Sequence, residues 1–388
     1  MNTQISIPSN HSLVKPIEDT SITLPFHLDG SSGLNRLNDE NLLGVSNDLD
    51  AITTWLNLYV DSPQTFRSYR KEIERLYRWC LTQAQKPFSS LTVEDVTEYW
   101  RFLSDPQPAN VWCGPKKPRS HPDWKPFSTP LSDASKELAF TIIGRCFGFL
   151  TESGYLRGNP IKLMSKAGRR NVDRKAAIER YLPQDVWQTL WQSVSTPPTS
   201  NAPTALNKHE RTRFLFALLY LQMPRVSEVV SHAMNSFYLE RGAWWWRITG
   251  KGNKTRKVPV GQNMIEALKR YRTHRGLSPL PSPHSEEPLI ASLQGERFIT
   301  ADMVYRIVKQ AAGEAAQHSN NAYDAERLTN ASTHWLRHTG LTHLADKGVD
   351  IRFLKASARH ESLETTQRYL HIEDDQWHQA INQQRFDG

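Results

Sequence analysis

The chain has 388 residues, a formal net charge of +8 and three cysteines, Cys80, Cys113 and Cys146. This length accommodates two or three domains, and the wide spacing of an odd number of cysteines excludes a disulfide framework or a paired-cysteine metal site. No segment approaches the ~18 apolar residues of a membrane span, and the N-terminus lacks the apolar stretch of a signal peptide. We therefore expect a soluble protein of a reducing cytoplasm, with a basic surface that suits a polyanionic partner.

Residues 1–46 are predicted to form a flexible or loosely docked acidic leader. They are polar, rich in Ser and Asn, and contain five acidic side chains against two basic ones. Such a segment lacks the apolar periodicity of a packed element. Its acidity argues against a DNA-binding arm.

Residues 47–156 are predicted to form a helical domain. Apolar residues recur at helical spacing in four segments, over residues 52–60, 66–80, 96–103 and 138–150. Ser62-Pro63 predicts the start of the second helix, and Thr92-x-x-Asp95 resembles a capping box before the third. Ser132 opens the fourth helix, and Gly154 suits its C-terminal end.

Two basic regions of this domain are candidate DNA contacts. One face of the second helix carries Arg67, Arg70, Lys71, Arg75 and Arg78, interleaved with Glu72 and Glu74. Either these residues form a solvated face joined by i,i+4 ion pairs, or they contact phosphates. Residues 104–131 are rich in proline, break every periodic pattern and include Lys116 and Lys117. A loop of this length in a compact domain is usually functional or disordered, so we consider it a candidate DNA-facing loop.

Residues 157–180 are predicted to be a basic interdomain linker. They hold eight basic side chains, including Arg169, Arg170 and Arg174, against two acidic ones. A basic strap between two basic domains would let them clamp a duplex, whereas the alternative is a solvated tether. The residues that follow favour the clamp.

Residues 181–388 alternate predicted helices with one short β region. A helix over residues 214–222 leads to Arg225, and strands over residues 243–249 and 257–260 flank a turn that holds Lys251, Lys254 and Arg256. At least one of the three tryptophans at 244–246 must point into the sheet core, because side chains alternate along a strand. Further helices are predicted over residues 262–274, 302–317, 335–347 and 351–357.

An ordered set of polar residues in this region predicts phosphodiester chemistry on DNA. The set is Arg225, Lys251, His334, Arg337, His360 and Tyr369. The sequence offers no acidic cluster for Mg²⁺ and no zinc-ligand spacing, so we expect neither a metal nor another cofactor. Guanidinium groups must then hold the phosphate, as their planar fork allows. Apolar neighbours on both sides of Arg225 predict a partly buried position for it.

Each remaining residue of the set has a chemical role and a plainer structural alternative. Lys251 has a proton for the leaving oxygen, or is only the basic tip of a hairpin turn. His334 suits the tyrosine proton and His360 a hydrogen bond to phosphate, although a single histidine is more often structural. Tyr369 is the candidate nucleophile; the alternative is a core aromatic at a helix end.

These motifs together resemble the tyrosine recombinase, or phage integrase, family. MPRVSEVV is similar to the family's first arginine box, GKGNKTRKVPV to its β-hairpin lysine, HWLRHTGLTHL to its His-x-x-Arg box, and ARHESLETTQRYLHI to its second histidine and nucleophile. The resemblance implies that the six residues form the active site and that Glu228 supports it. Two departures stand out: MPR replaces Gly-Leu-Arg, and SARH replaces Leu-Gly-His.

The resemblance implies a mainly α fold with a small β-sheet: an all-α, SAM-like core-binding domain followed by an α+β catalytic domain of the DNA breaking-rejoining type. It also implies a site-specific recombinase of a mobile element that forms a 3′-phosphotyrosyl intermediate without metal or ATP. Its partners would be double-stranded DNA, a homotetramer on two sites, and accessory DNA-bending or directionality proteins. A tail from about residue 373 would dock on a neighbouring protomer or in cis. The alternatives are a type IB topoisomerase-like enzyme and a catalytically silent DNA-binding regulator.

Overall fold

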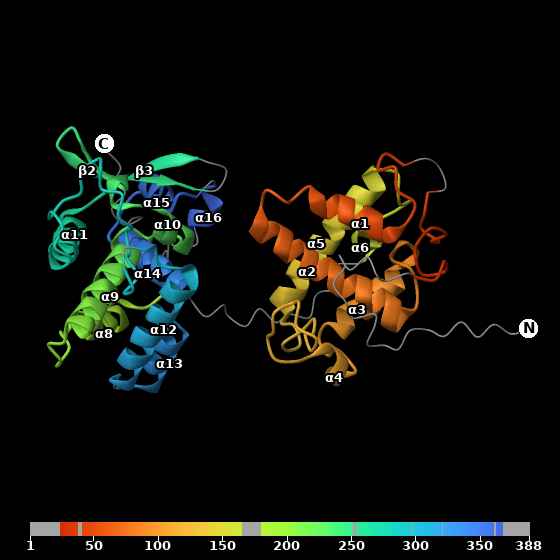
Figure 1. Cartoon of the computed structure of the whole chain (residues 1–388), viewed down its shortest axis with the longest axis horizontal. Coiled ribbons are helices and arrows are strands. Elements are labelled where there is room, and N and C mark those ends of the chain that lie inside the picture. Colours follow the sequence, from red (N-terminus) through yellow and green to blue (C-terminus); the bar gives the residue numbers. More distant parts are fainter. Residues whose placement is uncertain are drawn as a thin grey trace, which may run out of the picture. The chain divides into compact units, whose positions relative to one another are not determined.

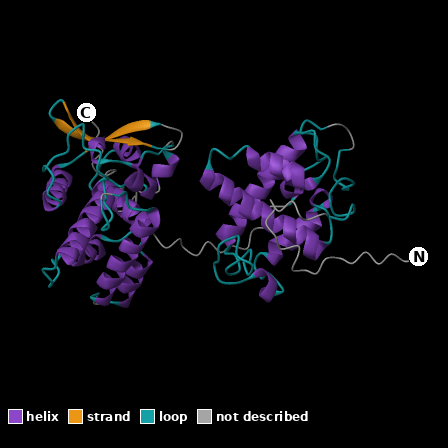
Figure 2. Cartoon of the chain, in the orientation of Figure 1, coloured by secondary structure: helices purple, strands orange, loops and turns teal. Residues whose placement is uncertain are grey.

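The structure is a computed structural model that describes residues 24–37, 41–164, 180–250, 254–295, 297–319, 321–360 and 362–367. The chain divides into two compact units, residues 1–175 and 176–388, each with its own hydrophobic core (Figure 1). Among the described residues, the strands all lie in the second unit (Figure 2). The predicted fold class, mainly helical with a small sheet, is confirmed. No helix within the described ranges combines the length and apolar character needed to cross a bilayer.

The first unit is built on four long helices that lie where the apolar periodicity predicts them. They are α1 (Asp48–Asn57), α2 (Pro63–Trp79), α3 (Val93–Phe102) and α5 (Asp133–Glu152). Shorter segments are η2 (Cys80–Ala84), η3 (Phe88–Ser90), α4 (Ala109–Trp112) and α6 (Pro160–Leu163).

The predicted helix starts in this unit follow the capping chemistry with one exception. The Thr92 hydroxyl accepts a hydrogen bond from the Asp95 amide, and the Asp95 carboxylate accepts one from the Thr92 amide, which completes the predicted capping box. Ser132 caps α5, and Gly154, just after that helix, has a positive φ of 74°. Ser62 makes no side-chain cap, so α2 begins on Pro63 alone, whose fixed φ suits a first helical residue.

The proline-rich segment 104–131 is part of the core. Trp112 and Phe127 are buried within it, and Arg75 of α2 donates two hydrogen bonds to the Pro126 carbonyl, at 3.0 and 2.8 Å. A buried guanidinium and two buried rings therefore fix the segment to α2, and its contact with DNA stays a prediction. Lys116 remains exposed in it, whereas Lys117 pairs with Asp123.

Parts of the predicted leader and of the predicted linker pack against the first unit. Part of the leader is packed: Leu28 is buried, and the Arg36 guanidinium lies 3.8 Å from the centre of the Tyr155 ring. The start of the linker is packed too, since Asn159 caps α6 and Ile161 is buried in the core. Residues 1–23, 38–40 and 165–179 lie outside the described residues, and with them Arg169, Arg170 and Arg174.

The second unit combines helices with an antiparallel sheet of order β1-β2-β3. Its strands are β1 (Phe237–Glu240), β2 (Ala243–Thr249) and β3 (Thr255–Pro259), of which β1 was not predicted. Trp246 pairs with Phe237 and with Val258 across the sheet and is fully buried, which confirms that one of the three tryptophans faces the core.

The helices of the second unit share a hydrophobic core with this sheet. They are α8 (Gln184–Ser195), α9 (Pro203–Leu221), α10 (Val226–Ser231), η4 (Met234–Ser236), α11 (Gln262–His274), α12 (Ala301–Gln317), α13 (Ala322–Asn330), α14 (Thr333–Asp346), α15 (Ile351–Ala358) and α16 (Glu364–Gln367).

Helix α14 approaches the end of α9 closely enough to require a glycine. A Cβ atom on Gly340 would lie 2.4 Å from the Tyr220 carbonyl oxygen and 2.8 Å from the Met223 side chain. Glycine therefore lets α14 lie against the turn that follows α9. Arg337, three residues earlier on α14, therefore lies close enough to donate a hydrogen bond to the Met223 carbonyl.

Candidate active site

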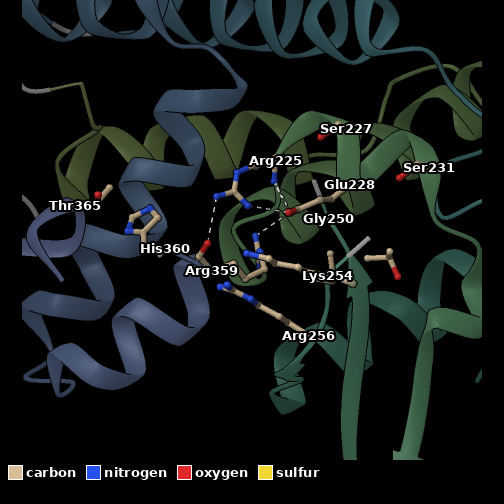
Figure 3. Close-up of a pocket in the computed structure, with 12 residues that line it drawn as sticks. Arg225, Ser227, Glu228, Ser231, Gly250, Lys254, Arg256, Arg359, His360 and Thr365 are labelled. Carbon is tan, nitrogen blue, oxygen red and sulfur yellow. Dashed lines mark hydrogen bonds and ion pairs between the residues drawn. The ribbon is translucent and has the colours of Figure 1, made fainter. Parts of the chain in front are cut away.

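A cavity of about 760 Å³ opens in the second unit, and the first arginine of the predicted set lines it (Figure 3). Its walls come from the start of α10, the ends of β2 and β3, and the segment after α15. The lining residues are Arg225, Ser227, Glu228, Ser231, Ile248, Thr249, Gly250, Lys254, Arg256, Arg359, His360 and Thr365. Four of them are basic, and two of these, Arg225 and Arg359, contact the carboxylate of Glu228.

Arg225 immediately precedes α10 and is held by Glu228. Its main-chain amide donates to Glu228 Oε2 at 2.7 Å, and its Nη1 donates to Glu228 Oε1 at 3.0 Å. Its Nη2 donates to the Arg359 carbonyl at 3.3 Å. The Arg225 side chain is 48% exposed and that of Glu228 is 3% exposed, so the arginine is partly covered, the carboxylate is the buried member of the pair, and the guanidinium extends into the cavity.

Arg337 is absent from the described lining of the cavity; it connects the turn before Arg225 to the end of α15. It is 5% exposed and donates from Nη1 to the Met223 carbonyl and from Nη2 to the Ala358 carbonyl. These bonds hold the plane of the guanidinium, which has five N–H donors in all. Met223 itself has a positive φ of 49°, at one of the two departures from the family pattern.

The two predicted histidines occupy different positions. His360 lines the cavity, and its Nδ1 is 3.0 Å from Thr366 Oγ1. His334 lies in the first turn of α14, because Ser332 caps that helix and the helix begins at Thr333, two residues before the predicted start. The His334 ring faces the His338 ring with centroids 4.2 Å apart, and His334 is absent from the described lining of the cavity.

The hairpin wall of the cavity supplies two further predicted basic residues. Lys254 and Arg256 line it, and the Gly250 amide donates to the Lys254 carbonyl at 3.1 Å. Lys251, between these positions, lies outside the described residues, as does the candidate nucleophile Tyr369.

Arg359 is a site residue that the sequence analysis did not predict. It ends α15 with a φ of 55° and is 5% exposed. Its Nη2 lies 3.0 Å from Glu228 Oε2 and donates to the Met223 carbonyl at 2.6 Å. Burial lowers the pKa of its guanidinium to about 10, and the charge of Arg225 acts in the same direction against the attraction of Glu228. The only signal in the sequence was the replacement of Leu-Gly-His by SARH.

His232 is a second site residue that the sequence did not predict. It joins the hairpin to α10. Its Nε2 accepts the Thr249 amide at 2.9 Å, so Nδ1 carries the proton and donates to the Glu228 carbonyl at 2.9 Å. Burial lowers the pKa of His232, which favours this neutral form. The ring therefore fixes the end of β2 relative to the main chain of Glu228.

The basic residues of α2 in the first unit differ in their exposure to solvent. Arg67 and Lys71 are exposed on α2, and Arg70 is half-buried over the Phe66 ring. Arg75 and Arg78, which the sequence placed on the same face, are buried and paired with Glu72 and Glu74. Within the described ranges, no group of histidine, cysteine and acidic side chains is arranged to hold a metal ion.

Comparisons with known proteins identify the family. A family model described as "Phage integrase family" matches residues 181–376. The tyrosine recombinase XerC of Thermodesulfovibrio yellowstonii is 30% identical over 315 residues, which cover 81% of this chain and 87% of the relative. The tyrosine recombinase XerD of Vibrio cholerae is 27% identical over 319 residues, covering 82% and 89%.

Solved structures are similar in fold. The Tn1549 transposon integrase in complex with transposon right end DNA superposes with a TM-score of 0.61 at 13% identity, covering 86% of this chain and 97% of the other. The XerH recombinase bound to palindromic difH substrate gives a TM-score of 0.58 at 18% identity, covering 96% of each chain. With the family model matching half of its length, this chain belongs to the phage integrase family of tyrosine recombinases.

Proposed function

We propose that the cavity beside Arg225 holds the scissile phosphodiester of a DNA recombination site. The chain is a site-specific recombinase that cuts and rejoins DNA. The observation that carries the proposal is the collection of Arg225, Lys254, Arg256 and His360 around one cavity. Basic groups converging on a concave site suit a phosphate, whose charge needs several fixed donors.

The reaction consists of two transesterifications. The Tyr369 hydroxyl oxygen attacks phosphorus, the bond from phosphorus to the 5′ oxygen breaks, and that oxygen takes a proton. The product is a 3′-phosphotyrosyl ester and a free 5′ hydroxyl. Attack by the 5′ hydroxyl of a second strand reverses these changes and releases the tyrosine, so the energy of the ester is conserved without ATP.

The residues of the set divide the remaining work. Arg225 and Arg337 stabilise the negative charge on the nonbridging oxygens as the pentavalent transition state forms. His360 donates a hydrogen bond to the phosphate, and His334 accepts or positions the proton of the nucleophile. Lys251 protonates the departing 5′ oxygen. The buried carboxylate of Glu228 holds Arg225 through both its main chain and its guanidinium.

We also propose the organisation around this chemistry. Residues 47–156 are a core-binding domain whose exposed basic residues contact phosphates of double-stranded DNA, and residues 181–388 are the catalytic domain. Four protomers act on two sites of a mobile element in the bacterial cytoplasm, with the tail from about residue 373 docked on a neighbour and accessory proteins setting direction. The similarity in fold to the Tn1549 transposon integrase in complex with transposon right end DNA supports the proposal of a mobile element.

Trapping the covalent intermediate tests the proposal. Fragmented DNA of the source genome is incubated with the full-length protein in EDTA, and protein-linked fragments are recovered under denaturing conditions and sequenced. A duplex with the recovered site and a nick beside the cleavage position then traps the adduct. We expect the adduct with the native protein and none with Tyr369→Phe, while specific binding of the duplex persists.

Tyr323→Phe is the matched control, because Tyr323 is exposed on α13 and absent from the described lining of the cavity. It should form the adduct at the native rate. An adduct that survives in Tyr369→Phe would remove the nucleophile assignment. Specific DNA binding without any adduct would favour a silent regulator, and strict dependence of cleavage on Mg²⁺ would contradict a metal-free mechanism.

A further inference from the structure

Arg359 has a main-chain conformation that favours glycine. Its φ of 55° lies in the left-handed region, where a residue with a Cβ atom is disfavoured. It is also 5% exposed, although a buried guanidinium is costly unless it is paired and hydrogen-bonded. A residue that is unfavourable in both respects must be held by strong local contacts.

The contacts of the Arg359 side chain all go to the segment that carries Arg225. Nη2 lies 3.0 Å from Glu228 Oε2 and donates to the Met223 carbonyl at 2.6 Å. Nη1 donates to the Gln222 carbonyl at 3.4 Å. One guanidinium therefore joins the end of α15 to the turn before Arg225 and to the carboxylate that holds Arg225.

Arg225 returns the contact. Its Nη2 donates to the Arg359 carbonyl, so the two arginines are joined directly as well as through Glu228 (Figure 3). The two oxygens of Glu228 have different partners, since Oε1 accepts from the Arg225 side chain, whereas Oε2 contacts the Arg225 amide and the Arg359 side chain. Rotation of the carboxylate would therefore break at least one of these contacts.

The charges of this cluster do not cancel. One carboxylate lies between two guanidinium groups, which leaves one positive charge in excess. Arg359 is buried, whereas Arg225 is 48% exposed and faces the cavity, so the excess charge is presented there by Arg225. With its pKa near 10, Arg359 is protonated at neutral pH and keeps Glu228 from fully neutralising Arg225.

We propose that Arg359 is a positioning residue for Arg225, acting through the carboxylate of Glu228. The inference rests on the proposed function of the cavity and adds to it a residue outside the six-membered set. Because His360 follows Arg359 directly, the same contacts set the main chain from which the His360 side chain enters the cavity.

Single-turnover cleavage of the nicked duplex at saturating protein tests this role. We expect Arg359→Gln to lower the cleavage rate constant by about 10- to 100-fold, the range for losing a partner that orients a functional group. Arg359→Lys should recover part of the rate, because it restores the charge beside Glu228. Arg359→Gly should remain slow although it removes the backbone strain. Binding of the duplex should change less than threefold, roughly, in all three variants.

Arg352→Gln is the matched control, since Arg352 lies on the same helix and is 79% exposed. It should cleave at the native rate. Thermal unfolding followed by circular dichroism establishes that each variant is folded at the assay temperature, and Arg359→Gly and Arg359→Lys keep the test open if Arg359→Gln does not fold.

A double-mutant cycle with Glu228→Gln separates positioning from a merely structural role. If Arg359 acts through Glu228, the cleavage rate constant of the double variant should be within about twofold of that of the slower single variant. Both changes then remove the same support of Arg225. Multiplying effects would overturn the proposal, and so would a native rate in Arg359→Gly or a loss of binding that accounts for the whole defect. Failure of the proposed function is seen separately, as an adduct that persists in Tyr369→Phe.

Discussion

The two units of the molecule contain the same charge arrangement with opposite exposure. In the first unit, Glu74 is shared by Arg78 of α2, at 3.0 Å, and by Arg119, at 2.5 Å. In the second unit, Glu228 is shared by Arg225 and Arg359, each at 3.0 Å. Both carboxylates are 3% exposed, and each leaves one positive charge in excess.

The two clusters differ in the exposure of their guanidinium groups, and this difference determines the role of each cluster. Arg78 is 3% exposed and lies 4.6 Å from the centre of the Trp124 ring, so its charge is directed at an aromatic face inside the unit. Arg225 is 48% exposed and borders a cavity. The first cluster therefore fastens the segment 104–131 to α2, and the second presents charge to a ligand.

The largest effect is expected from removing the carboxylate of the fastening cluster. Glu74→Gln leaves two guanidinium groups beside a neutral amide in a buried position, which should lower the free energy of unfolding by about 3–5 kcal/mol. Urea unfolding measures this, with Glu98→Gln, an exposed carboxylate on α3, as the control that should change little. If Glu74→Gln unfolds like the control, the cluster does not fasten the segment and the contrast between the units fails.

A loss of similar size, but in rate rather than stability, is expected from Arg225→Gln. Removing a guanidinium aimed at the charge that develops on the phosphate should slow single-turnover cleavage by about 100- to 1,000-fold. The amide of residue 225 still donates to Glu228, so the urea midpoint should stay close to the native value. A stable protein with an unchanged cleavage rate would show that Arg225 is only another surface ion pair.

The sequence predicted the features that depend on the local pattern of residues, such as the bounds of a helix. Helix α11 has the predicted bounds, residues 262–274, because its apolar spacing and its neighbours agree. The family motifs predicted that Arg225, Glu228 and His360 lie together. All three line one cavity, although more than a hundred residues separate the first two from His360 in the chain. Strand β1 has only four residues and was missed, since such a segment carries little periodicity.

The sequence did not predict which charged residues are buried, for a physical reason. Arg67, Arg75 and Arg78 all read as one basic face, but α2 is covered on two sides once the segment 104–131 folds over it. The positions of Met223 and Arg359 show the same limit. A backbone φ is set by the turn, so only the structure reveals that both residues are in the left-handed region and that one binds the carbonyl of the other.

The smallest effect is expected at the exposed end of α2, where the contrast between fastening and presenting charge can be sharpened. Arg67 is exposed on the helix that carries the buried Arg75. If Arg67 meets a DNA phosphate, Arg67→Gln should reduce the slope of log affinity against log salt by about one, because one fewer counterion is released on binding.

The same variant should leave the free energy of unfolding within about 0.5 kcal/mol of the native value, as is usual for an exposed residue. Arg75→Gln on the same helix should behave in the opposite way, with lower stability and an unchanged salt slope, since its guanidinium is held by Glu72 and the Pro126 carbonyl. Equal salt slopes for Arg67→Gln and the native protein would assign Arg67 to a solvated face, and the first unit would then contact DNA through other residues.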